Sequence, residues 1–315
     1  EAERQASAQG LEHTETFPLL MMATAGMMLF PAANDLLTLF VALEVFSLPL
    51  YLLCGLARRR RLLSQEAALK YFLLGAFTSG FLVYGIALTY GYAGSMGYAE
   101  IANALNGRTG GHGLLLAGMG LIAVSLLFKV GAAPFHVWTP DVYQGAPTAV
   151  TAFMAAATKV AAFGALLRIF YVAFGGARWD WLPMFYVVAI LTMLVGSVMA
   201  LTQSDVKRLL AYSSIAHAGF LLVGFLGARE LSTSGAPSIN AIQAVLFYLV
   251  TYGFMTMAAF AIVTLVRDSR GETTDLASWA GLGKESPLIA GVFSFLLLAM
   301  AGIPLTSGFM GKLAV

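Results

Sequence analysis

The sequence predicts an all-α, polytopic membrane protein. Of its 315 residues, 59% are hydrophobic and only 11% carry a charged side chain, whereas soluble domains carry about 25% charged residues. The mean hydropathy is +0.81, and long apolar runs follow one another with short polar connections between them. The net charge of +2 gives no reason to expect nucleic acid as a partner, whereas lipid is expected around the helices.

Nine apolar runs are long enough to cross a bilayer, whose hydrocarbon core takes about 20 apolar residues per helix. The predicted spans are residues 17–33, 35–56, 66–92, 113–138, 147–174, 181–202, 206–228, 239–266 and 287–315. Gly, Pro, Asn and Ser are frequent between them, which is typical of short loops. Residues 1–16 are predicted to form a polar loop. Because the chain starts at Glu1 and stops within an apolar run, we expect further helices before and after it.

The basic residues between the spans predict the orientation of the helices, because cytoplasmic loops carry an excess of Lys and Arg. If the run Arg58–Arg61 faces the cytoplasm, strict alternation places a second basic group on the same side. That group comprises Lys207, Arg208, Arg267, Arg270 and Lys284. The opposite side receives only Arg108, Arg178 and Arg229. This asymmetry agrees with the predicted number of spans.

Two of the predicted spans contain a proline in a glycine-rich stretch, so we expect both helices to be broken. In the fourth span Pro134 follows Lys129, and in the ninth Pro304 precedes Lys312. A proline inside a helix removes a backbone hydrogen bond, and the freed carbonyl is tolerated at membrane depth only beside protein or water. Paired breaks favour a transport pathway between inverted repeats. A simple proline kink is the alternative for either span alone.

Four of the ionisable side chains within the predicted spans stand out, each lying in an otherwise apolar stretch: Glu44, Lys70, Lys129 and Lys159. A charge at the centre of a membrane helix costs roughly 2.5–3.5 kcal/mol on insertion scales, so we interpret the four as a path for protons or other ions. Lys129 and Lys159 are too far from a helix end to reach the headgroups. For Glu44, a protonated acid hydrogen-bonded between helices is the alternative. For Lys70, about one turn inside the cytoplasmic end of its predicted helix, the alternative is snorkelling.

A buried lysine near a carboxylate has the properties that proton transfer requires. Desolvation can bring the pKa of a lysine from about 10.4 to near neutrality. A carboxylate about 6 Å away stabilises the protonated form of the lysine by roughly 3 kcal/mol at an effective dielectric near 20. That energy is comparable with the roughly 2.3 kcal/mol needed to move one charge against 100 mV. Movement of Glu44 relative to Lys129 would therefore switch the lysine between holding and releasing a proton.

His136, just after Pro134, and His217, on a helix face with serines, are candidate proton relays. For each, a histidine that only packs in the interior is the alternative. The four histidines form no HxxxH or HExxH pair, and the single cysteine excludes a four-cysteine iron–sulfur cluster within the chain. We therefore expect no metal site, no bond-breaking chemistry and no redox centre here.

Several long motifs resemble the antiporter-like membrane subunits of proton-pumping NADH:quinone oxidoreductase, respiratory complex I. The motifs are LEVFSLPL at 43–50, FKVGAAPFHVWTPDVYQGAP at 128–147, DVKRLLAYSS at 205–214 and AGIPLTSGFMGK at 301–312. The stretch from Trp138 to Pro147 and the setting of Glu44 are most similar to the subunit N, or chain 2, type. The similarity covers almost the whole chain.

The resemblance implies an antiporter-like fold of fourteen helices with two inverted five-helix repeats. This chain would hold the fourth to the twelfth helix, with the first repeat at 17–174 and the second, incomplete one at 181–315. Glu44 would tune Lys129 on the broken seventh helix. Lys159 would connect the two halves and Lys312 would face the exit. Lys70 would match a sixth-helix lysine of this subunit type.

The resemblance also implies a proton-translocating membrane-arm subunit, with other membrane-arm subunits and lipid as its partners. NADH, FMN, iron–sulfur clusters and quinone would bind to other subunits. The location implied is the bacterial cytoplasmic membrane, with an organellar energy-converting membrane as the alternative. Two other functions stay open: a subunit of a multi-subunit sodium/proton antiporter with the same fold, and a structural subunit whose buried charges are paired and dry.

Overall fold

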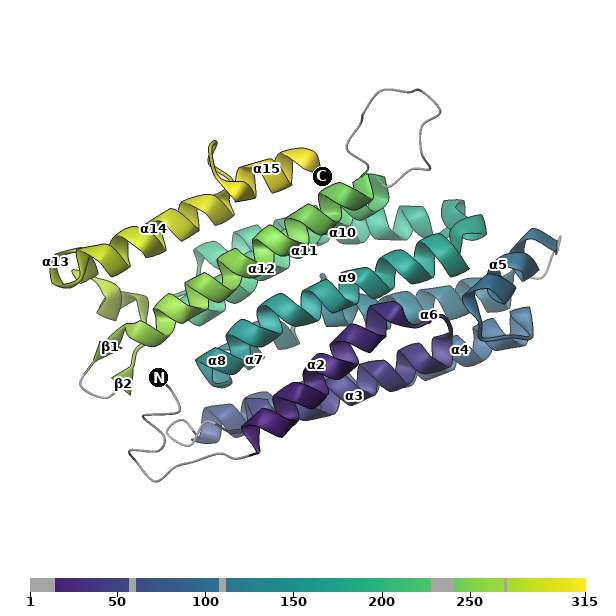
Figure 1. Cartoon of the computed structure of the whole chain (residues 1–315), viewed down its shortest axis with the longest axis horizontal. Helices are drawn as coiled ribbons and strands as arrows, with labels where there is room; N and C mark the ends of the chain where they lie inside the picture. The colour runs from purple at the N-terminus through teal and green to yellow at the C-terminus, as the bar shows by residue number, and fades with distance from the viewer. Residues whose placement is uncertain (1–14, 57–60, 108–111, 228–240, 269–270) are drawn as a thin grey trace.

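The structure is a computed structural model that describes residues 15–56, 61–107, 112–227, 241–268 and 271–315. It is an elongated bundle in which most helices run along the long axis (Figure 1). Within the described residues, seven helical segments are long and apolar enough to cross a membrane. The elements in chain order are α2 (Thr16–Ala32), α3 (Leu36–Cys54), α4 (Arg61–Ala93), α5 (Tyr98–Gly107), α6 (Gly113–Val130), α7 (Trp138–Gly145), α8 (Thr148–Phe153), a π-helical turn (Met154–Thr158), α9 (Lys159–Arg168), a second π-helical turn (Ile169–Ala173), a 3-10 turn (Gly175–Ala177), α10 (Arg178–Leu201), α11 (Val206–Gly227), α12 (Ala241–Leu265), β1 (Arg267–Asp268), β2 (Gly271–Glu272), a 3-10 turn (Leu276–Trp279), α13 (Leu282–Glu285), α14 (Pro287–Ala301) and α15 (Ser307–Ala314).

All nine predicted spans contain helices, and the prediction of an all-α membrane fold is confirmed. The first predicted span has the expected length, because α2 has 17 residues, whereas the ninth is divided into α14 with 15 residues and α15 with 8. α14 is short because it ends at the predicted break. Within the described residues, β pairing is limited to a two-residue antiparallel ribbon, β1 with β2, and two isolated bridges, Asp35 with Gly97 and Asp205 with Asp275.

Both predicted helix breaks are present, but each begins at a glycine rather than at the proline. α6 ends at Val130, where Gly131 has φ 77°, and α14 ends before Gly302, which has φ 83°. Left-handed backbone of this kind favours glycine and closes many helix C-termini. Pro134 and Pro304 lie in the non-helical stretches that follow, so they prevent the helix from resuming at once.

Several connections predicted as loops contain helices instead: α5 before the fourth predicted span, α7 after it, and α13 before the ninth. Between the third and fourth predicted spans, α5 packs against the π-helical turn at Ile169–Ala173. Tyr98 and Ile101 are buried and Leu105 packs against the same core. Their spacing of three and four residues is the apolar periodicity of a helix, so the signal was present in the sequence but short.

Parts of the predicted loops lie outside the described residues. The polar loop at 1–16 is among them, apart from its last two residues, and so are the basic residues Arg58, Arg59, Arg60, Arg108, Arg229 and Arg270. Of the basic residues that predict the orientation, those that are described lie at or near helix ends, with Lys207 and Arg208 in the first turn of α11.

The interior of the bundle contains large polar aromatic side chains as well as apolar ones. Tyr71, Tyr143, Tyr248 and Tyr252 are among the largest fully buried side chains. A buried tyrosine hydroxyl usually needs a hydrogen-bond partner. These tyrosines come from α4, α7 and α12. Tyr71 lies beside Lys129, and Tyr252 lies beside Lys159.

Candidate proton pathway

Lys129 lies in the last turn of α6, directly before the break, and is only 2% exposed. Its amine donates a hydrogen bond to the Ser47 hydroxyl at 2.8 Å and lies 3.4 Å from the Tyr51 hydroxyl, both on α3. The ring centroids of Phe46, Tyr51 and Tyr71 lie 5.4, 5.5 and 5.7 Å from the amine. Aromatic faces attract a cation, so this cage replaces part of the hydration that burial removes.

Glu44 lies on α3, three residues before Ser47 and thus on the same side of the helix. The carboxylate accepts a hydrogen bond from the Ser79 hydroxyl of α4 at 2.5 Å, a length typical of a charge-assisted bond. Among the described residues, no direct hydrogen bond or ion pair joins Glu44 to Lys129. The two charges still interact electrostatically, with the Ser47 hydroxyl as the direct partner of the amine. The arrangement couples the pair without locking it into a salt bridge.

Lys159 is the first residue of α9, directly after a π-helical turn, and is also 2% exposed. Its amine donates to the backbone oxygen and the hydroxyl of Ser214 on α11. The hydroxyl of Tyr252, on α12, lies 3.3 Å from the amine and donates to the Ser214 hydroxyl at 2.7 Å. No acidic side chain in the described part of the chain pairs with Lys159. A charged amine with only neutral partners is costly in the interior, which favours exchange of its proton.

His217 and Lys312 continue this chain of polar groups along α11. His217 is buried three residues after Ser214, and its Nδ1 lies 2.6 Å from the Tyr248 hydroxyl. It interacts electrostatically with both Lys159 and Lys312. The Lys312 amine lies 4.8 Å from the ring centroid of Phe220, three residues further along α11. The structure therefore brings Lys159, His217 and Lys312 to one side of α11.

The second helix break supplies the hydrogen-bond partners of Lys312. Its amine, on α15, donates to the backbone oxygens of Met300 and Ala301 at 2.8 and 3.1 Å. These are the last carbonyls of α14, which have no partner within the helix. The negative end of the helix dipole also favours a cation there. The break in the helix thus creates a site for the Lys312 amine.

Lys70 is placed differently from the other lysines. Its side chain is 42% exposed, and its amine pairs with Glu66 and Asp141, each at 2.7 Å. Because α4 begins at Arg61, Lys70 lies about two and a half turns into its helix rather than one. Within the described residues, no hydrogen bond joins Lys70 to Lys129. Its place on the pathway stays a prediction.

His136 is half-buried in the stretch between α6 and α7, with its ring 6.5 Å from that of Tyr212. Its buried Nδ1 has no hydrogen-bond partner among the described residues. No contact in the described structure joins His136 to Lys129, so its role as a relay stays a prediction as well.

The sequence alone did not reveal the neutral partners of the buried amines, the hydroxyl partner of Glu44 or the pairing of Lys70 with Asp141. The partners are Ser47, Tyr51, Ser79, Asp141, Ser214 and Tyr252. A helical face carries the signal for two of them, because Ser47 lies three residues from Glu44 and Ser214 three residues from His217. The same holds for Tyr51, four residues after Ser47 on α3. Ser79, Asp141 and Tyr252 come from other helices and give no local signal.

The described residues contain no group of three or more His, Cys, Asp or Glu that could hold a metal ion. Cys54 is buried, with its sulfur 3.6 Å from the sulfur of Met154. The polar groups described above are therefore amines, hydroxyls, an imidazole and carboxylates, all of which can exchange protons.

Comparisons with known proteins identify the family of the chain. Residues 33–315 match the family described as NADH:quinone oxidoreductase/Mrp antiporter, TM. The chain is 68% identical over 315 residues to NADH-quinone oxidoreductase subunit N of a Nocardioides species, covering 100% of this chain and 59% of that protein. It is 65% identical to subunit N of Rhodococcus opacus, covering 100% of this chain and 56% of that protein. The chain thus spans less than two thirds of the length of these relatives.

Two solved structures have the same fold. A chain of respiratory complex I from Thermus thermophilus aligns with a TM-score of 0.77 and 41% identity, over 97% of this chain and 64% of that one. A chain of the Mrp complex from Dietzia aligns with a TM-score of 0.82 and 29% identity, over 94% of this chain and 53% of that one. The resemblance noted in the sequence is confirmed: the chain belongs to the family of antiporter-like membrane proteins that NADH:quinone oxidoreductase shares with the Mrp antiporter.

Proposed function

We propose that this chain translocates protons as part of a subunit N-type membrane subunit of an NADH:quinone oxidoreductase. The observation that carries the proposal is the environment of Lys129 and Lys159, two buried amines held by hydroxyls and aromatic rings. Ionisable side chains in a membrane bundle are costly, and they commonly mark ion or proton pathways. A purely structural subunit would be expected to keep such charges in direct salt bridges, and Glu44 and Lys129 do not form one in the described structure.

The comparisons favour the oxidoreductase over the sodium/proton antiporter. Identity to the complex I chain is 41%, against 29% for the Mrp chain. Curated relatives at 68% and 65% identity are named NADH-quinone oxidoreductase subunit N. On this basis the partners of the chain are the other membrane-arm subunits and lipid, in the bacterial cytoplasmic membrane. NADH, FMN, iron–sulfur clusters and quinone belong to other subunits, and this chain breaks no bonds itself.

The proposed proton path begins with the switch between Glu44 and Lys129. The negative carboxylate favours a protonated Lys129, and neutralising or moving that carboxylate favours release of the proton. The proton then passes laterally to Lys159, whose partners Ser214 and Tyr252 can each accept one proton while donating another. His217 follows on α11, and Lys312 releases the proton on the outer side.

We infer further that the chain contains two inverted repeats, at 17–174 and 181–315. Each holds one broken helix with a left-handed glycine at the break, Gly131 with φ 77° and Gly302 with φ 83°. In the first repeat Lys129 immediately precedes the break, and in the second Lys312 binds the carbonyls that the break frees. Lys70 and His136 lie in the first repeat as candidate groups on the predicted cytoplasmic side.

Replacing Lys129 with alanine in the complete oxidoreductase tests this function. Proton pumping into membrane vesicles, measured per NADH oxidised, should fall severely while the subunit content of the membranes stays normal. Lys284→Ala is the matched control, because Lys284 is an exposed lysine on the short helix α13. An assembled Lys129→Ala complex that pumps like the Lys284→Ala complex would refute the proposal.

A further inference from the structure

We propose that Asp141 and Trp138, both on the half-helix α7, position the Lys129 site. Asp141 holds α7 in place through ion pairs with neighbouring helices. Trp138 links α7 to the backbone next to Lys129 and to the aromatic rings around its amine. This inference rests on the proposed function, since it describes how the Lys129 site is held in its working geometry.

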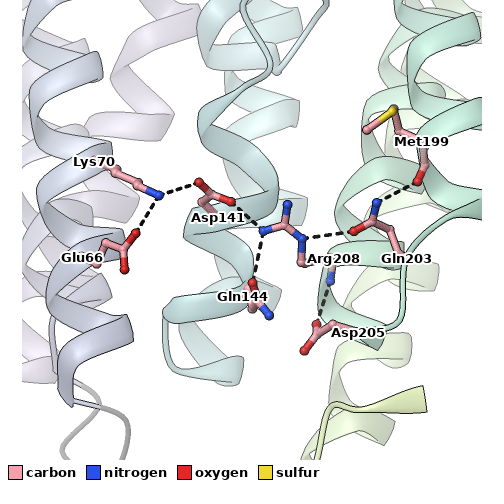
Figure 2. A network of polar contacts seen from close by, with 8 residues as sticks. All are labelled: Glu66, Lys70, Asp141, Gln144, Met199, Gln203, Asp205 and Arg208. Atoms are coloured by element: carbon pink, nitrogen blue, oxygen red, sulfur yellow. Dashed lines mark hydrogen bonds and ion pairs between the residues drawn. The ribbon is translucent and has the colours of Figure 1, made fainter. Parts of the chain in front are cut away.

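The anchor is a carboxylate shared by cations from two other helices (Figure 2). One oxygen of Asp141 accepts a hydrogen bond from Lys70 of α4 at 2.7 Å, and the other accepts one from Arg208 of α11 at 2.6 Å. Arg208 also donates to the Gln144 side chain of α7 and the Gln203 side chain before α11, each at 3.1 Å. Both oxygens of Asp141 are therefore in use, and α7 is tied to α4 on one side and to α11 on the other.

The C-terminal end of α7 is fixed by two further contacts. The buried amine of Lys207, next to Arg208 on α11, donates to the backbone oxygen of Ala146 at 2.6 Å. At Gly145 the backbone of α7 lies so close to α4 that an added Cβ would stand 2.5 Å from the backbone oxygen of Leu63. With little freedom at this end, the placement of α7 is set by its partners on α4 and α11.

Trp138, three residues before Asp141, contacts both the backbone and the cage of Lys129. Its indole N–H donates to the backbone oxygen of Phe128 at 2.9 Å, so it partners a carbonyl of the final turn of α6. Its ring stacks on Tyr71 with a centroid distance of 4.7 Å and an interplanar angle of 9°. Tyr71 in turn lies 5.7 Å from the Lys129 amine and packs edge-on against Tyr51 at 4.6 Å.

A displacement of α7 would therefore move the Phe128 carbonyl and the Tyr71 ring together. The peptide link across the break, residues 131–137, is not helical, so the side-chain contacts of Trp138 and Asp141 supply a rigid connection that the chain itself lacks. Lys70 then influences the pathway through its pairing with Asp141. This explains a paired, half-exposed lysine beside a pathway built from buried amines.

Asp141→Asn in the complete oxidoreductase tests the anchor. It keeps the size of the side chain and removes the charge that binds Lys70 and Arg208. Proton pumping per NADH should fall about tenfold to a hundredfold at normal subunit content, the cost typical of a site displaced by about 1 Å. Asp141→Glu should restore most of the pumping, because the charge is back. Asp180→Asn, at an exposed aspartate in the first turn of α10, is the matched control and should pump like the wild type.

Combining the variant with Lys129→Ala separates positioning from a general structural role. If Asp141 acts through Lys129, Asp141→Asn should cause no additional loss of pumping in the Lys129→Ala background. Independent losses that multiply, or wild-type pumping in Asp141→Asn alone, would overturn the positioning role. Wild-type pumping in Lys129→Ala would instead overturn the proposed function. Should Asp141→Asn prevent assembly, Trp138→Phe replaces it in the same comparison with and without Lys129→Ala. Phenylalanine keeps a ring against Tyr71 but lacks the N–H donor. Losses that multiply, or wild-type pumping in Trp138→Phe alone, would again overturn the positioning role.

Discussion

The Ser47 hydroxyl accepts a hydrogen bond from the Lys129 amine at 2.8 Å, while its own hydrogen goes to the Leu43 backbone oxygen at 2.5 Å. A serine whose only hydrogen is committed to its helix presents lone pairs to the amine. This geometry suits a protonated Lys129. If Lys129 loses a proton, it no longer needs both of its acceptors, Ser47 and Tyr51, and the hydroxyl of either can turn toward it. Ser47 is thus a neutral contact between the helix of Glu44 and Lys129, the lysine that we propose Glu44 controls.

Ser47→Ala should reduce proton pumping, because the Lys129 amine loses its closest acceptor in a buried site. A hydrogen bond to a charged group contributes about 1.5–3 kcal/mol, which corresponds to roughly a tenfold to hundredfold effect. The measurement is proton uptake by vesicles per NADH oxidised. Ser278→Ala, at an exposed serine in the 3-10 turn before α13, should leave pumping unchanged. Equal pumping in the two variants would show that Ser47 is not a functional partner of Lys129.

Tyr252→Phe should slow the lateral transfer while preserving the packing around Lys159. The substitution removes the hydroxyl that donates to Ser214 at 2.7 Å and lies 3.3 Å from Lys159. It keeps the ring whose centroid lies 4.9 Å from the amine. Pumping should fall about fivefold or more, the effect of losing about 1 kcal/mol, with normal subunit content. Tyr186→Phe, at a tyrosine that is 49% exposed on α10, is the control. A loss of the same size in both variants would refute the role of the hydroxyl.

The sequence was sufficient to predict the spans and the two breaks, because hydrocarbon imposes strict rules on both. Apolar runs of sufficient length must be helical in a bilayer core, and Pro134 and Pro304 cannot sit in the interior of a regular helix without a cost. The position of each break was less predictable. Gly131 and Gly302 begin the breaks, and glycines are too frequent in this chain, 33 in all, for any one of them to be singled out.

The site could be predicted for the ionisable residues and not for their partners. Lys129, Lys159 and Glu44 were recognisable because a charge in an apolar run is costly. Their hydroxyl partners are serines and tyrosines, which are common in helices, and most of them reach the ionisable residues only when helices distant in sequence pack together. Asp141 is the clearest case: it lies outside the apolar spans, and its partner Lys70 is 71 residues away along the chain. No local pattern marks such a pair.

Gly308→Ala should disturb the second break, where α15 carries Lys312. An added Cβ at Gly308 would stand 1.8 Å from the backbone oxygen of Ala299 on α14, so the two half-helices would have to separate. Overpacking of this kind costs about 1–3 kcal/mol or more. We expect a lower thermal unfolding temperature of the purified complex and weaker pumping, since Lys312 binds carbonyls of α14. Gly283→Ala is the control, because nothing lies within 4 Å of the Cβ added there. Equal unfolding temperatures would contradict the close approach of α14 and α15.

The contribution of Asp141 to stability should be independent of pH between about pH 5 and pH 8. Burial alone would raise the pKa of Asp141, but hydrogen bonds from Lys70 and Arg208 outweigh it and hold the pKa below 3.8. A group whose pKa is lower in the folded state stabilises that state above its unfolded pKa, about 3.9. The stabilisation is lost as the pH falls through the folded value. For a carboxylate that is 33% exposed, its size should be about 1 kcal/mol.

Thermal unfolding of the complex with Asp141→Asn, compared with the wild type across this pH range, measures that contribution. The difference in unfolding temperature should be constant from about pH 8 to pH 5 and should shrink only below about pH 4, where the wild-type carboxylate takes up a proton. Asp180→Asn should show no difference from the wild type in the same range. A difference that changed between pH 8 and pH 6 would mean that a group titrating near neutrality governs the contacts of α7, and the ion pairs of Asp141 with Lys70 and Arg208 would then not be what holds this half-helix.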